Sequence, residues 1–195
     1  MTKQPFKDTF DRNRFNLKDS STKSQRWFQQ QVSSMRGSTT PERLMKETPS
    51  DLKSRLYPGF LYMFFYDPKH KDTLPYYDRF PLVFPYSVVK GGFIGLNMHY
   101  LPYQLRIRLL DSLMVYASNS KMDQRTKIMY SWNLIGNVSK FAPAKPCIKQ
   151  YLTNHVTSPF KKIEAKDWAT AMMLPVEQFT ASKQKIWADS KRKMI

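Results

Sequence analysis

Three short apolar stretches in the middle of the chain predict β-strands. Residues 60–66, FLYMFFY, have no polar break, which indicates a strand that is buried on both faces. Residues 81–85, PLVFP, predict a short second strand whose flanking prolines favour an edge position or strand ends. Residues 91–102, GGFIGLNMHYLP, predict a third strand that is entered through a Gly-Gly turn, and Gly95 within it indicates a bulge or a close backbone approach.

Helical spacing of apolar residues appears on both sides of these strands. Before them, residues 23–35 and two short segments that follow predict helices. After them, helices are expected over residues 102–119, 123–137, 145–156, 164–175 and 182–195. Residues 145–156 show the spacing most clearly, because Ile148, Tyr151, Leu152 and His155 recur on one helical face, which makes His155 a core residue.

This order of elements predicts an α+β fold. We expect a small antiparallel sheet of about three strands, flanked by N- and C-terminal helices and extended basic arms. Strands in the middle and helices at both ends argue against a parallel α/β sheet. The predicted organisation is an N-terminal arm with short helices (1–55), a compact core domain (56–180) and a basic C-terminal tail (181–195).

Net charge narrows the classes of partner. The 195 residues include 32 Lys and Arg against 15 Asp and Glu, a net charge of +17. The excess is densest in residues 181–195, which carry five basic residues and one acidic residue. A positive electrostatic field of this size attracts nucleic acid, an anionic membrane face or acidic protein. The alternative interpretation is a basic protein whose charge has no specific partner. We expect neither a membrane span nor a signal peptide, because no long apolar run is present.

Cofactor and metal motifs are not found. A single cysteine, Cys147, excludes an internal disulfide and a thiolate zinc cluster. The three histidines, His70, His99 and His155, lack the spacing of metal ligands, and no phosphate-binding glycine loop or serine nucleophile motif occurs. We therefore expect no cofactor and no metal site.

Three aspartates close together raise the possibility of a nuclease. Asp67, Asp72 and Asp78 would suit a Mg²⁺ site if they converged, and Glu164-Ala165-Lys166 is similar to half of a common nuclease core. That half needs an upstream aspartate on a neighbouring strand, which is lacking. We favour the interpretation that turns position the aspartates, because an Asp-Pro pair opens a turn at Asp67 and Asp78 has Arg79 as a neighbouring ion-pair candidate.

Features of nucleic-acid binding are better represented. Cations on surfaces and loops contact phosphates, and tyrosines between them stack on bases at an end or in a single strand. The tyrosines also have a simpler explanation, which is packing at the sheet edge. The candidate residues are Lys69, Lys71, Tyr76, Tyr77, Arg79, Lys90, Arg106, Arg108, Lys161, Lys162, Lys191, Arg192 and Lys193. No base-reading motif is present, so binding is expected to be largely independent of sequence.

Four stretches resemble a known family. They are YDPKHKDTLPYYDRFPLVFP, GGFIGLNMHYLP, KPCIKQYLTNHVTSPF and IWADSKRKMI, all within residues 56–195, whereas the first 55 residues show no likeness. Together they resemble small virion proteins of T-even-like contractile-tailed bacteriophages, described as DNA end protectors. The resemblance implies a late protein, made in the host cytoplasm and carried in the virion, that sits on the genome end. It implies no particular site residues.

Three hypotheses follow. The first is a non-enzymatic protein that binds double-stranded DNA ends and protects the genome terminus from host exonuclease, with other virion proteins as further partners. The second is a structural adaptor of the phage neck, portal or baseplate, whose arms order against neighbouring subunits. The third is a Mg²⁺-dependent nuclease. Binding that depends steeply on salt would support the first hypothesis. Fixed symmetric copies in the particle without contact to DNA would support the second, and DNA cleavage that requires Asp72 would support the third.

Overall fold

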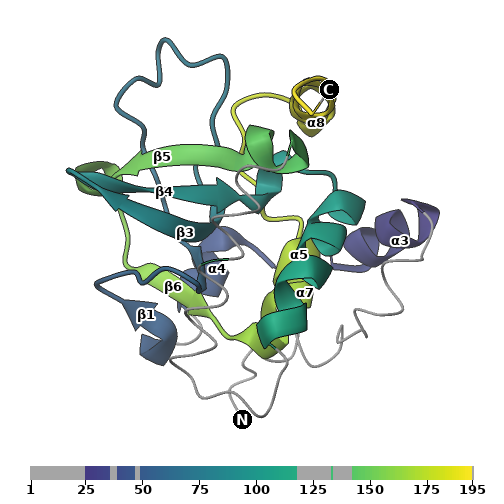
Figure 1. Cartoon of the computed structure of the whole chain (residues 1–195), viewed down its shortest axis with the longest axis horizontal. Coiled ribbons are helices and arrows are strands. Elements are labelled where there is room, and N and C mark those ends of the chain that lie inside the picture. The colour runs from purple at the N-terminus through teal and green to yellow at the C-terminus, as the bar shows by residue number, and fades with distance from the viewer. Residues whose placement is uncertain (1–24, 36–38, 47–48, 118–132, 134–141, 195) are drawn as a thin grey trace.

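A six-stranded antiparallel sheet forms the centre of the molecule, in the order β1-β6-β2-β3-β4-β5. The computed structural model in Figure 1 describes residues 25–35, 39–46, 49–117, 133 and 142–194. Its strands are β1 (Leu52–Lys53), β2 (Leu61–Met63), β3 (Leu82–Val89), β4 (Gly92–Asn97), β5 (Ile148–Leu152) and β6 (Phe160–Ile163). Its α-helices are α3 (Gln25–Met35), α4 (Pro41–Lys46), α5 (Tyr103–Ala117), α7 (Trp168–Met173) and α8 (Lys183–Arg192). Its 3-10 helices are η1 (Pro49–Asp51), η2 (Met98–Tyr100), η3 (Ala142–Cys147), η4 (Thr153–His155) and η5 (Ala165–Asp167).

The α+β class and the antiparallel sheet are confirmed, but the expected number of strands is wrong. β2 and β4 lie in the stretches that predict strands, β3 begins in the predicted stretch 81–85 and continues to Val89, and β1, β5 and β6 are additional. β1 and β6 have only two and four residues, too few for a period to be recognised. They become strands because β6 pairs with β1 on one side and with β2 on the other.

The helix expected over residues 145–156 is also wrong. Residues 148–152 form β5, which pairs with β4 from Gly92↔Leu152 to Leu96↔Ile148. The Tyr151 ring stacks on Phe93 at 5.2 Å, so the open edge of β4 and its aromatic face favour the extended chain. The helices expected over residues 23–35, 102–119, 164–175 and 182–195 are confirmed by α3, α5, α7 and α8. Apart from residue 133, the helix expected over residues 123–137 lies outside the described residues.

Both faces of strand β2 are buried, which explains its unbroken apolar run. Leu61 and Met63 belong to the larger core cluster, whereas Tyr62 and Phe64 point into a second, aromatic cluster. This alternation is the period of two that a strand imposes. Helices α5 and α7 cover the larger cluster, on one side of the sheet (Figure 1).

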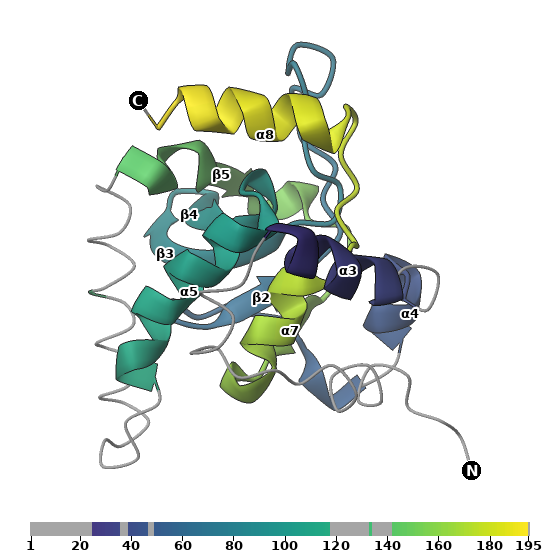
Figure 2. The same cartoon turned by 90° about the vertical axis from the view of Figure 1, so that its right-hand side faces the viewer.

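The segments before and after the central strands share the larger core. Val32 of α3, Leu44 of α4 and Ile186 of α8 are buried in the same cluster as the sheet residues. Helix α8 lies across the end of the molecule next to β5, as Figure 2 shows. None of the helices within the described ranges has the length and apolar character of a membrane span.

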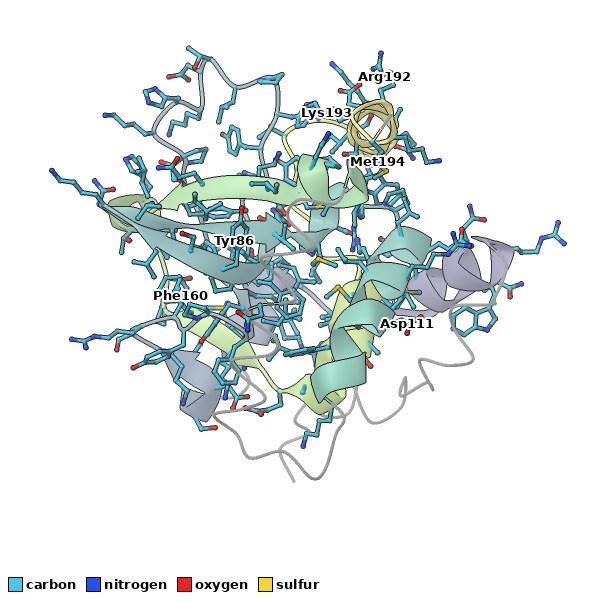
Figure 3. All side chains as sticks on the ribbon, viewed as in Figure 1. Tyr86, Asp111, Phe160, Arg192, Lys193 and Met194 are labelled. Carbon is cyan, nitrogen blue, oxygen red and sulfur yellow. The ribbon has the colours of Figure 1, made fainter. Side chains whose placement is uncertain are left out.

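Gly95 marks a close approach of two backbones, as its position in the strand predicts. It pairs with Pro85 of β3, and the register shifts between Pro85 and Ser87, so Tyr86, labelled in Figure 3, is an extra residue opposite β4. A Cβ atom at Gly95 would lie 2.8 Å from the carbonyl oxygen of Phe84. The sheet therefore requires glycine at this point.

Substitution of Gly95 by alanine is expected to lower the free energy of unfolding by about 1–3 kcal/mol, because the added Cβ forces the β3 backbone to move. Urea unfolding followed by tryptophan fluorescence measures this change. Gly91→Asn is a suitable control, because nothing lies near a Cβ there and asparagine tolerates the φ of +75°. Equal stability of the two variants would contradict the close approach.

Candidate nucleic-acid interface

A pocket of about 610 Å³ lies between the loop of residues 66–78, strand β5 and the end of α8. The loop connects β2 to β3 and projects from the sheet beside β5 (Figure 1). Lysine and aromatic side chains dominate the lining: Lys69, Lys149, Lys193, His70, Tyr66, Tyr76, Tyr77, Tyr100 and Tyr151. Four segments that are distant in sequence, the loop, η2, β5 and the end of α8, therefore bring these side chains together.

Turns and one cross-connection hold the loop in place. The Lys71 ammonium group binds the Asp67 carboxylate at 3.1 Å. The Asp67 amide donates to the His155 carbonyl at 3.0 Å, and the His155 ring nitrogen Nδ1 donates to the Asp67 carbonyl at 2.8 Å. Asp67 thus opens a turn, as the Asp-Pro pair predicts. His155 is only half-buried in η4, so the expectation that it is a core histidine is wrong.

Asp78 lies at the base of the loop, and its carboxylate is fully engaged in the fold. Only 4% of the residue is exposed. Four groups donate to the two oxygens: His99 Nδ1 at 2.7 Å, Phe80 N at 3.1 Å, Asn97 Nδ2 at 3.2 Å and Gln178 N at 3.2 Å. The expected ion pair between Asp78 and Arg79 is replaced by these contacts.

The aspartates do not form a metal centre in the described part of the chain. No group of three His, Cys, Asp or Glu side chains there is arranged to hold an ion. Asp67 and Asp78 are engaged as above, Asp72 is exposed in the loop, and Glu164 pairs with Lys162 at 3.2 Å. The geometry therefore gives the nuclease hypothesis no support.

Lys149 of β5 is the most unusual cation of the pocket. Its ammonium group lies 4.0 Å from the centre of the Tyr100 ring, which is a cation–π contact. Burial lowers the pKa of Lys149 to about 8; repulsion from Lys193 contributes in the same direction, and Cys147 opposes it. The site therefore contains a partly desolvated positive charge that an incoming anion would stabilise.

The two loop tyrosines are half-buried at the same pocket. The Tyr76 ring lies 6.1 Å from the Tyr100 ring at an interplanar angle of 40°. The Tyr77 amide donates to the Thr180 hydroxyl at 3.1 Å, and the Thr180 amide donates to the Tyr77 carbonyl at 3.1 Å. These contacts fix the aromatic part of the loop against the chain that leads into α8.

A buried ion-pair network positions α8 beside the pocket. Arg106 of α5 contacts the Glu177 carboxylate at 2.5 Å, and the other carboxylate oxygen accepts from Lys183 at 2.5 Å. Burial by itself would raise the pKa of Glu177, but Arg106, His99 and Lys183 lower it to about 2. The indole of Trp187 donates to the His99 carbonyl at 2.9 Å, which ties α8 to η2.

Comparison with known proteins gives the family. The phage T4 terminal DNA protecting protein family matches this chain over residues 6–193. The chain belongs to that family. The match confirms the resemblance that was inferred from four stretches within residues 56–195. It also covers most of the first 55 residues, in which the sequence alone showed no likeness to the family. A search of curated proteins and a search of solved structures found no significant match.

Several of the residues predicted to bind DNA lie at the pocket or next to it. Four of them line it: Lys69, Tyr76, Tyr77 and Lys193. Lys71 and Arg79 in the loop region and Arg192 in the last turn of α8 are exposed and adjacent in sequence to lining residues. Lys191, also exposed in that turn, lines another hollow with residues of α3 and α5. Arg192 is paired with Asp189, and Figure 3 shows it with Lys193 at the end of α8. Lys90 precedes Gly91, which shares a neighbouring hollow with Lys69.

Two of the predicted cations are buried, so the expectation that they lie at the surface is wrong. Arg106 is 0% exposed and bonds to Glu177 and to three backbone carbonyls, of Leu101, Met172 and His99. Lys161 of β6 is also 0% exposed, with its ammonium group 3.8 Å from Asp51. Both side chains serve the fold.

Two others lie outside the pocket. Arg108 is exposed on α5, and Lys162 is on β6, where it pairs with Glu164 and lies 4.2 Å from the Phe60 ring.

The sequence prediction missed Lys149 and Tyr100. The helical period of residues 145–156 placed Lys149 on an outer helix face, and Tyr100 looked like part of a strand. Ile148 and Tyr151, both favoured in strands, are the signal that could have suggested β5.

Proposed function

We propose that this protein binds the ends of double-stranded DNA largely independently of sequence and shields the genome terminus from host exonuclease. It acts without catalysis or a cofactor. Membership of the terminal DNA protecting protein family supports this function. The observation that carries the proposed site is the pocket in which Lys69, Lys149 and Lys193 surround tyrosine rings.

Cations around the pocket supply the affinity. The loop carries Lys69 and Lys71, and the end of α8 carries Lys191, Arg192 and Lys193, all exposed. Lysine and arginine bind phosphates through charge, and phosphate contacts carry no base information. Contacts of this kind account for binding that does not depend on sequence.

The tyrosine rings supply the preference for an end. Inside a duplex each base pair is covered on both faces by its neighbours, whereas the last pair exposes one face. Tyr76 and Tyr77 are held at the mouth of the pocket by the loop, where they stack on a terminal or frayed base. Stacking tolerates any base, because every base has an aromatic face.

The protein is expected to protect linear blunt DNA from a processive duplex exonuclease in proportion to the number of ends. Fragments of different length, compared at equal concentration of ends, should need the same amount of protein. Full-length DNA remaining after digestion measures this protection. A covalently closed circle of equal mass should compete much less well than linear DNA.

Tyr76→Ala combined with Tyr77→Ala is expected to weaken binding to ends by about tenfold or more, because stacking on one base contributes about 1–3 kcal/mol. Tyr57→Ala is the matched control, since Tyr57 is 60% exposed and does not line the pocket.

Equal competition by linear and circular DNA would contradict the proposed function. It would indicate binding along the duplex, whereas no binding to either DNA would favour the adaptor hypothesis, in which the basic surface contacts acidic virion subunits.

The proposed function also includes contacts within the virus particle. The protein is made in the host cytoplasm and carried in the virion, where it also contacts other virion proteins but no membrane.

A further inference from the structure

Two lysines converge in the pocket without a carboxylate partner. Lys149 comes from β5 and Lys193 from the end of α8, and within the described chain neither forms an ion pair. Their charges affect one another, since Lys193 contributes to the lowered pKa of Lys149. An anion between the two ammonium groups would relieve this repulsion and offset the desolvation of Lys149.

One acidic side chain lines the pocket, and it does not neutralise the lysines. Asp78 receives four hydrogen bonds, of which the shortest, 2.7 Å, is from His99. Its carboxylate is therefore turned to partners within the fold. Lys69 adds a third ammonium group to the lining, so the pocket is positively charged overall.

The size and lining suit one nucleotide. A volume of about 610 Å³ is within the range of small-molecule sites, about 300–1,000 Å³, but is too small for a duplex. The half-buried Tyr76 and Tyr77 line the same pocket as Lys149, so a base can stack on them while its phosphate meets the lysines. A single frayed nucleotide satisfies both parts of the lining.

The charge of the phosphate discriminates between an end and the interior of a strand. An internal phosphodiester carries one negative charge, whereas a terminal phosphomonoester carries about −1.5 to −2 at pH 7. Two ammonium groups on one pocket complement the monoester better than the diester. Such a monoester occurs only at a strand end.

We propose, on the basis of the proposed DNA-end function, that this pocket admits the terminal nucleotide of one strand and recognises its phosphomonoester group through Lys149 and Lys193. The protein thereby distinguishes a phosphorylated end from a hydroxyl end and from continuous duplex. The base of that nucleotide stacks against the tyrosine rings.

Three short blunt duplexes of one sequence test this inference, with 5′-phosphate, 3′-phosphate or only hydroxyl ends. Fluorescence anisotropy at fixed salt is expected to show about tenfold tighter binding to one phosphorylated duplex than to the hydroxyl duplex. Preference for the 5′- or for the 3′-phosphate supports the inference and identifies the strand that enters. Equal affinity for all three duplexes overturns it.

Variants assign the effect to the two lysines. Lys149→Met keeps the apolar stem of the side chain, and Lys193→Gln changes an exposed residue, so neither is expected to disturb the fold. Each should bring the ratio of affinities for phosphorylated and hydroxyl ends close to one. Lys166→Gln removes the same charge from an exposed residue outside the pocket and should leave the ratio unchanged. An unchanged ratio in both pocket variants overturns the assignment.

A mononucleotide separates this inference from the proposed function. Titration of the protein with deoxyadenosine 5′-monophosphate, deoxyadenosine 3′-monophosphate and deoxyadenosine, followed by NMR, needs no duplex binding. Binding of a monophosphate but not of the nucleoside supports the pocket, even if duplex ends are not protected. Protection of ends with equal affinity for phosphate and hydroxyl termini overturns the inference and leaves the proposed function intact.

Discussion

Affinity for a blunt DNA duplex is expected to fall by roughly 10³–10⁵ between 50 and 200 mM salt. The reason is that each neutralised phosphate releases condensed counterions, and the proposed interface reaches about six to ten phosphates. The described cations at or near the pocket are numerous enough: Lys69, Lys71, Arg79, Lys90, Lys149, Lys191, Arg192 and Lys193.

A salt titration of the dissociation constant, plotted on logarithmic axes, measures the number of phosphates contacted. Replacing Lys191, Arg192 and Lys193 together by glutamine should remove about three phosphate contacts. The slope should become less steep accordingly, because each contact contributes about 0.9 to it. Substitution is preferable to deletion, because Ser190 and Ile186 of α8 are buried. Lys166→Gln serves as the control and should leave the slope unchanged. Binding that hardly responds to salt would exclude a phosphate-based interface.

Replacement of the buried Arg106 by leucine is expected to lower the free energy of unfolding by about 3–5 kcal/mol. The guanidinium group is completely buried and lies 2.5 Å from Glu177, so its removal leaves a buried carboxylate whose remaining salt bridge, within the described residues, is to Lys183. The variant also loses three hydrogen bonds to backbone carbonyls that join η2, α5 and α7. Chemical denaturation followed by circular dichroism measures the loss.

Lys183→Gln provides the matched comparison for Arg106. Lys183 contacts the same Glu177 carboxylate, but its side chain is 30% exposed, so its loss should cost only about 1 kcal/mol or less. Both variants remove one cation from the same carboxylate, so a difference between them reflects the burial of Arg106 and its three hydrogen bonds to backbone carbonyls. Similar stability losses in the two variants would show that the burial of Arg106 does not matter.

The central strands could be predicted because their signal is local. Leu61 to Phe64 alternate between two apolar clusters, so the run has no polar break and reads as a strand in isolation. β5 could not be predicted in the same way. Ile148, Tyr151 and Leu152 fit a helical face as well as a strand, and only the unpaired edge of β4 with its Phe93 ring decides between them.

The candidate site shows the same division. Lys69, Tyr76 and Tyr77 lie in one polar, proline-rich loop, so sequence alone identified them as candidates for contact with a partner. Lys149 joins them only because β5 passes under that loop, and Lys193 only because α8 packs across the same end. The positions of Lys149 and Lys193 beside the loop therefore depend on contacts between segments that are distant along the chain.

Local pattern and composition were sufficient to establish the α+β class, the three central strands, most of the described helices, the basic charge and the likeness to the DNA end protector family. Each of these depends on residue type and on spacing within one segment. Which cations reach the surface was decided by tertiary packing. Arg106 and Lys161 look no different in sequence from Arg108 and Lys162, yet the first two are buried beside Glu177 and Asp51. Burial is a property of how elements pack, and a linear pattern of residues does not contain it.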